Sequence, residues 1–105
     1  MLVDRPLDLD SAADEIRRRT PEWTGRGIDV RPISSDDQHE HGPSVGARLR
    51  KHDAEGEVVV YRSGRVELRS WSTDPRDAML DEALDDCLTV ERFGLVLDIL
   101  VVLFA

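Results

Sequence analysis

The sequence predicts a single α+β domain spanning residues 1–105, and three observations support this class. The middle of the chain alternates apolar and polar residues over short segments separated by turn residues, which is typical of strands. Segments with helical patterning precede and follow this region, and a length of 105 residues suits one modest core. We therefore expect an antiparallel meander of three or four strands, packed against a C-terminal amphipathic helix and preceded by a short N-terminal helix.

The first expected element is a helix that begins at Ser11. Ser11 suits the N-cap position, and Asp14 three residues later is favourable in the first helical turn. Pro21 disfavours helical backbone angles in the residue before it, so we expect the helix to end at Thr20 after about ten residues. The arginines at 17–19 would then lie in the last turn, where positive charges interact favourably with the helix dipole.

Two strands are expected before the most regular part of the sequence. Residues 28–33 form a strand candidate in which Ile28 and Val30 alternate with charged side chains, and Pro32 either makes this segment an edge strand or ends it there. Residues 45–52 alternate between small or apolar side chains and basic ones, which predicts one buried and one exposed face.

The stretch Val58–Trp71 predicts a hairpin with two alternative registers. A two-residue turn at Ser63-Gly64 pairs Tyr61 with Val66, whereas a three-residue loop with Gly64 in the left-handed region pairs Val60 with Val66. Both registers place the same four residues on the face opposite the core: Arg65, Glu67, Arg69 and Trp71.

A longer helix is expected to begin at Asp74, which suits the N-cap position before Pro75 at the first helical position. One side of this helix is apolar and the other is acidic, and the acidic face consists of Asp77, Asp81, Glu82, Asp85 and Asp86. Gly94 is a natural stop or kink. The apolar residues 95–104 that follow are compatible with either a helix or a buried strand, and we favour a helix.

Charge excludes some classes of partner. The chain carries a formal net charge of −8, and residues 74–105 alone hold eight acidic and two basic residues. Because this charge repels phosphate, we expect no nucleic-acid partner, even though the hairpin region is rich in arginine. The same charge makes a basic protein partner more plausible, and the alternative interpretation is that the acidity only aids solubility.

The sequence contains no pattern that indicates catalysis. No nucleophile–base spacing, phosphate-binding loop or Cys-x-x-Cys motif is present, so we expect neither an enzyme nor a cofactor. His39 and His41 are candidate metal ligands, but a solvent-exposed loop is the simpler interpretation. The single cysteine, the lack of a secretory signal and the lack of a membrane-spanning stretch predict a cytoplasmic protein without membrane contact.

The segments "GARLRKHDAEG" and "EGEVVVYRSGRVELRSW" resemble the central part of the TriTu-type immunity proteins of bacterial polymorphic toxin systems. The resemblance covers about residues 44–71 and centres on the Tyr61-Arg62-Ser63-Gly64 stretch of the hairpin. The chain departs from that pattern where Tyr61 replaces an expected tryptophan and in the basic character of its hairpin. The resemblance implies a cytoplasmic, non-catalytic protein that neutralises a toxin by binding it, with no catalytic residues to carry over.

The leading hypothesis is therefore an immunity-like, protein-binding module. The acidic helix face would hold a basic partner, and Arg69 and Trp71 would provide a second contact, because Arg and Trp are common interface anchors. One alternative is a homodimeric interaction domain that uses the apolar segment 95–104. A second alternative is a small metal- or ligand-binding domain that uses His39 and His41.

Overall fold

A computed structural model describes residues 7–36, 42–52, 54–72, 80–84, 89–102 and 104, without the side chains of residues 72 and 80–82. Two helices enclose a run of five strands along the chain. The elements are α1 (Leu9–Gly25), β1 (Asp29–Ser35), β2 (Ser44–Lys51), β3 (Ala54–Tyr61), β4 (Val66–Ser72), β5 (Leu80–Leu84) and α2 (Val90–Val102).

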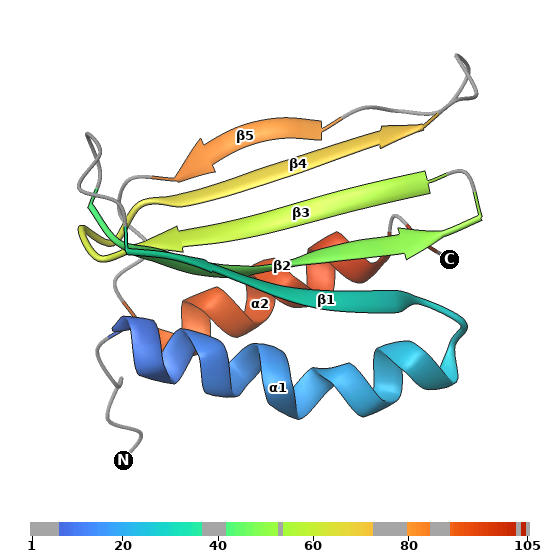
Figure 1. The fold of residues 1–105 in the computed structure, drawn as a ribbon, viewed down its shortest axis with the longest axis horizontal. Coiled ribbons are helices and arrows are strands. Elements are labelled where there is room, and N and C mark those ends of the chain that lie inside the picture. The colour runs from blue at the N-terminus through green and yellow to red at the C-terminus, as the bar shows by residue number, and fades with distance from the viewer. Residues whose placement is uncertain are drawn as a thin grey trace.

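The five strands form one antiparallel sheet in the order β1-β2-β3-β4-β5, so that each strand pairs with its neighbour in sequence. Both helices lie on the same side of this sheet, and no other described helix or strand covers its opposite face (Figure 1). The predicted α+β class, the antiparallel meander and a helix at each end of the fold are confirmed. Pro32 lies in β1, which is an edge strand as expected. Proline has no backbone N–H to donate, so it is tolerated in a strand that pairs with a neighbour on one side only.

The sheet has one strand more than the three or four expected. Residues 80–84 form β5, so the helix predicted from Asp74 is wrong over this segment, and residues 73–79 and 85–88 lie outside the described part of the chain. Leu80 and Leu84 are four residues apart, a spacing that fits one face of a helix and one face of a strand equally well. Pairing with β4 supplies this segment with ladder hydrogen bonds and packs Leu84 against the core, which local helical preference cannot offer.

Helix α1 is longer than predicted and has a different N-cap. Asp8 caps it: its carboxylate accepts a hydrogen bond from the Ser11 N–H at 2.7 Å, and the Ser11 hydroxyl accepts one from the Asp8 N–H at 3.0 Å. The predicted end at Thr20 is wrong, because the helix continues through Pro21. A proline inside a helix costs about 3 kcal/mol, whereas losing a buried tryptophan costs about 3–5 kcal/mol. Continuation brings Trp23, which is 2% exposed, into the core and so outweighs the proline.

Two open questions about local structure are settled by the backbone. The hairpin adopts the register with a three-residue loop, in which Val60 pairs with Val66 and Gly64 has a φ angle of 94°. The apolar C-terminal segment is helical, as favoured, although α2 begins at Val90 rather than after Gly94. Gly94 lies inside this helix, so its predicted role as a stop is wrong.

The core lies between the covered face of the sheet and the two helices. Alternate residues of β2, β3 and β4 point toward the helices and are fully or almost fully buried, as are the inward residues of α1 and α2. The largest buried side chains are Trp23, Phe93, Leu49, Leu97 and Leu100. Neither helix packs on the other face of the sheet, where the side chains of Arg48 and Arg69 are more than half exposed.

Candidate functional site

The uncovered face of the sheet carries charged side chains arranged in rows across the strands. Cross-strand pairing joins Arg31 to Arg48, Arg48 to Glu57, Glu57 to Arg69, and Arg69 to Asp81. Directly opposed residues of neighbouring strands share one face of a sheet, so this row crosses all five strands. Arginines therefore predominate on the β1–β2 side of the row, Glu57 separates Arg48 from Arg69, and the backbone position that follows on β5 is that of Asp81.

Ion pairs join β2 to β3 on this face. Arg48 contacts Glu57 at 3.0 Å, and Arg50 contacts Glu55 at 3.7 Å. Glu55 also accepts a hydrogen bond at 2.9 Å from the indole N–H of Trp71 on β4. This bond satisfies the polar edge of Trp71 and holds its ring in place on the sheet.

A second group of polar contacts surrounds Glu67 on β4. Its carboxylate accepts a hydrogen bond from the Tyr61 hydroxyl at 3.2 Å and pairs with Arg65 at 3.1 Å and with Arg69 at 3.9 Å. Partial burial, followed by the negative charge of Glu67, raises the pKa of Tyr61 above its ordinary value. Tyr61 therefore remains a neutral hydrogen-bond donor throughout the physiological pH range.

The structure brings together three of the residues that the sequence predicted as partner-binding. Arg69 of β4 pairs directly with Asp81 of β5, and Trp71 lies two residues further along β4. Arg65, Glu67, Arg69 and Trp71 were expected to share the face opposite the core, and the register confirms this. The candidate site is therefore the β4–β5 side of the uncovered face.

The predicted acidic helix face does not exist over residues 80–84. Asp81 and Glu82 are consecutive positions of a strand, which alternate between the two faces of a sheet, and Glu82 pairs with the buried residue Leu68. Asp77, Asp85 and Asp86 lie outside the described residues. Part of the acidic segment therefore lies on an edge strand of the sheet, not on one face of a helix.

Several residues of this face were missed from the sequence. Glu55, Glu57 and Tyr61 contribute to it, and each bonds to a side chain on this surface. The signal was present in the sequence, because continuing the alternation of 45–52 into the next strand pairs Arg48 with Glu57 and Arg50 with Glu55. Arg31 was also missed, and it forms no ion pair with any other described residue.

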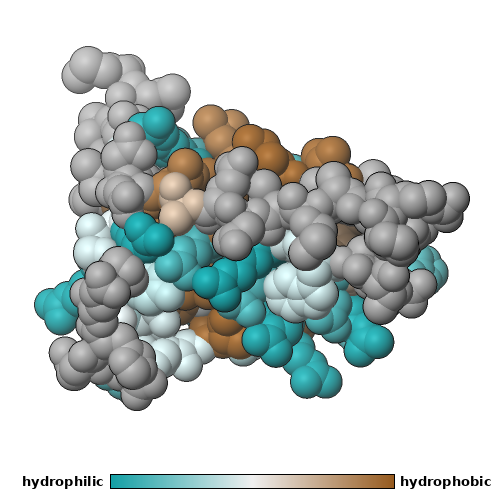
Figure 2. Space-filling view, turned by 90° about the horizontal axis from the view of Figure 1, so that it is seen from above, coloured by the Kyte–Doolittle hydropathy of each residue, from teal (hydrophilic) through white to brown (hydrophobic). Residues whose placement is uncertain are grey.

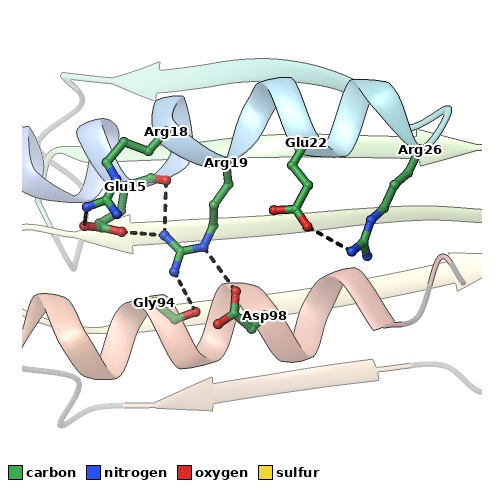
Figure 3. A network of polar contacts seen from close by, with 7 residues as sticks. All are labelled: Glu15, Arg18, Arg19, Glu22, Arg26, Gly94 and Asp98. Carbon is green, nitrogen blue, oxygen red and sulfur yellow. Dashed lines mark hydrogen bonds and ion pairs between the residues drawn. The ribbon is translucent and has the colours of Figure 1, made fainter.

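The arginine triplet at 17–19 lies in the middle of α1, so its predicted place in the last helical turn is wrong. Glu15, which is 5% exposed, forms ion pairs with both Arg18 and Arg19 (Figure 3). Arg19 also reaches α2, where it contacts the Asp98 carboxylate at 3.2 Å and the Gly94 carbonyl oxygen at 3.5 Å. Burial lowers the pKa of Arg19, but Glu15 and Asp98 outweigh it and raise the pKa above its ordinary value. The cluster joins the two helices and has a structural role.

An apolar groove of about 620 Å³ lies between α1 and the first two strands. Ile16, Val30 and Val45 line it, together with a few polar residues. One of these, Thr20, already donates its hydroxyl proton to the Ile16 carbonyl oxygen at 2.8 Å. The groove therefore offers few specific donors to a ligand.

The remaining site predictions concern metal and membrane. His39 and His41 lie outside the described residues, and the segments that the structure does describe hold no cluster of three or more potential metal ligands. Within the same segments, no helix combines the length and apolar character needed to cross a bilayer.

Comparisons with protein-family models, with curated proteins and with solved structures find no match for this chain. The resemblance to TriTu-type immunity proteins therefore stays a prediction.

Proposed function

We propose that this chain is a non-catalytic, immunity-like protein-binding module that captures a basic protein partner on the β4–β5 side of its uncovered sheet face. One observation carries the proposal: the register of β4 and β5 places Arg69 opposite Asp81, two residues from Trp71, on a face that neither helix covers. One residue of the acidic group that the sequence predicted, Asp81, is thereby paired in the backbone register with Arg69, one of the two predicted anchors.

The chemistry of this surface suits a protein rather than a small ligand. Tryptophan, tyrosine and arginine are enriched among the residues that dominate protein–protein binding energy. Trp71 and Tyr61 are both held by hydrogen bonds to glutamates of the same sheet, so they lose little freedom when a partner binds. The arginines of β2 and the glutamates of β3 neutralise each other in ion pairs, and they form the polar rim that is typical of an interface.

The acidity of the chain supports a basic partner. Residues 74–86, which include β5, contain six acidic residues and one basic residue. The opposite side of the face carries Arg31 directly across from Arg48. A basic surface would therefore be attracted toward β5 and repelled from β1. This charge pattern would orient the partner and raise its rate of association.

The resemblance of residues 44–71 to immunity proteins supports a toxin domain as this partner and the cytoplasm as the place of binding. Neutralisation by binding needs no catalytic residue in this chain. The charge asymmetry and the sheet face are independent of that resemblance, so protein binding is also supported without it.

The test is binding to a basic toxin domain encoded beside this chain, measured by calorimetry at two salt concentrations. Trp71→Ala should weaken binding by about 30-fold or more, as expected for an interface anchor. Asp81→Arg should also weaken binding, and the loss of affinity should be larger at low salt than at high salt, because salt screens the charge. Asp14→Arg provides the matched charge reversal on the exposed side of α1 and should bind like the wild type. Unchanged affinity of both site variants, or an equal loss in Asp14→Arg, would contradict the proposal.

A second candidate function is a homodimeric interaction domain. The exposure of three large apolar side chains on α2 favours it, and this surface is separate from the sheet face.

A further inference from the structure

Helix α2 exposes apolar side chains on the side that faces away from the core. Leu95 is 63% exposed, Ile99 63% and Val102 66%, and in the described part of the chain these are the large hydrophobic residues that solvent reaches most. A group of hydrophobic side chains lies along the upper edge of the view in Figure 2, whereas hydrophilic ones predominate in its lower part. We call Leu95, Ile99 and Val102 the α2 stripe.

The other side of the same helix is buried in the core. Phe93, Leu97 and Leu100 are each 0% exposed. A helix that is apolar around most of its circumference is typical of an element covered on both sides. The sheet and α1 cover one side of α2, and the α2 stripe lies on the exposed side beside Asp98, where a second apolar surface could cover it.

The spacing of the α2 stripe is self-complementary. Its residues are four and three positions apart, which is the spacing of a helix–helix packing seam. An α-helix rises about 1.5 Å per residue, so along the helix axis Leu95 lies about 6 Å before Ile99 and Val102 about 4.5 Å after it. An antiparallel copy of the helix would therefore place Leu95 against the partner's Val102, and Ile99 against its own counterpart.

The charges beside the stripe permit such an approach. Asp98 precedes Ile99, and its carboxylate pairs with Arg19 at 3.2 Å within the same chain. Two copies would therefore not bring two uncompensated carboxylates together at the centre of the contact. Antiparallel helices also place opposite ends of their macrodipoles side by side, which is favourable.

We propose that the α2 stripe is the interface of a symmetric homodimer in which α2 packs antiparallel to the α2 of the partner, with Ile99 at the two-fold axis. The proposal rests on the second candidate function, homodimerisation, and concerns a different surface from the sheet face, so it stands or falls independently of the docking proposed for that face. A stable interface buries about 800 Å² on each partner, and three side chains on one short helix provide less. The dimer should therefore be in concentration-dependent equilibrium, with a dissociation constant in the micromolar to millimolar range.

The first experiment is sedimentation equilibrium of the full chain from about 10 μM to about 1 mM, which brackets this range. The wild-type protein should shift toward the dimer mass as its concentration rises. Ile99→Glu should remain monomeric over the whole range, whereas Thr24→Glu, an equal charge change at an exposed position of α1, should dimerise like the wild type. Circular dichroism checks that all three are folded. A wild-type monomer at the highest concentration would overturn the proposal, as would a dimer that persists in Ile99→Glu.

A disulfide experiment tests the antiparallel geometry. The native cysteine is first removed as Cys87→Ser, and single cysteines are then introduced on the stripe. Ile99→Cys should form a covalent dimer under mild oxidation, because a residue at a two-fold axis meets its own counterpart within disulfide distance. Leu95→Cys alone should not, whereas Leu95→Cys combined with Val102→Cys should. Efficient cross-linking of Leu95→Cys alone would indicate parallel helices and refute this geometry.

Discussion

Replacing Arg19 with methionine tests whether the charged cluster between the helices stabilises the fold. The side chain of Arg19 is 20% exposed and that of its partner Glu15 is 7% exposed. Removing one partner of a buried ion pair costs about 3–5 kcal/mol, because the remaining charge is left without compensation. Arg18 still contacts Glu15 at 3.0 Å, so the loss should be smaller. We expect Arg19→Met to lower the free energy of unfolding by about 2 kcal/mol.

The neighbouring arginine provides a matched control. Arg17 pairs with Asp14 at 2.6 Å, but the two side chains are 75% and 65% exposed, so water screens their attraction. Exposed pairs of this kind contribute roughly 0.5 kcal/mol or less. Arg17→Met is the same substitution on the same helix, and it should change stability by no more than that amount.

Urea denaturation followed by tryptophan fluorescence and by circular dichroism measures both variants. Arg19→Met should also melt about 10 °C lower than the wild type, since 1 kcal/mol shifts the midpoint of a domain of this size by roughly 4–8 °C. Equal stabilities of Arg19→Met and Arg17→Met would refute the argument, because burial is the main difference between the two sites.

Three further predictions concern local contacts. Tyr61 is the one tyrosine of the chain, so ultraviolet titration should show its pKa above the ordinary value, and Glu67→Gln should bring it closer to that value. Because the folded-state pKa is raised, the stability that this contact contributes is present at neutral pH and is lost as the pH rises through that pKa. Gly56→Ala should destabilise the fold by about 1–3 kcal/mol in thermal melts, because a Cβ there would lie 2.9 Å from the Phe104 ring. Hydrogen bonds from the Ser11 backbone and side chain lower the pKa of Asp8, so wild type should lose stability relative to Asp8→Asn as the pH falls through that lowered pKa.

The part of the fold that depends on local signals could be predicted. Alternation placed the arginine-rich strand and the hairpin in a meander, and the glycine of the hairpin allowed the register that is observed. Arg69 and Trp71 were assigned to one face because residues two apart in a strand share a face. These inferences need only the geometry of the chain over a few residues.

The parts that failed depend on contacts between distant segments. The burial of Trp23 determines where α1 ends, and pairing with β4 determines that residues 80–84 form a strand. Neither partner is visible in the local sequence, where Pro21 favours a stop and the acidic residues favour a solvent-exposed helix. The predicted acidic face failed for the same reason, because its geometry required a helix at Asp81 and Glu82.

The two proposed surfaces can operate together. Helix α2 lies on the covered side of the sheet, and the candidate docking face is the opposite side (Figure 1). A dimer formed through the α2 stripe would therefore leave both docking faces free. A partner that carries two sites, or that is itself dimeric, would then be bound more tightly than one site allows, because the second contact forms at the high effective concentration set by the first. Ile99→Glu should remove this gain without changing the affinity of a single docking face, which separates the contribution of dimerisation from that of Trp71 and Asp81.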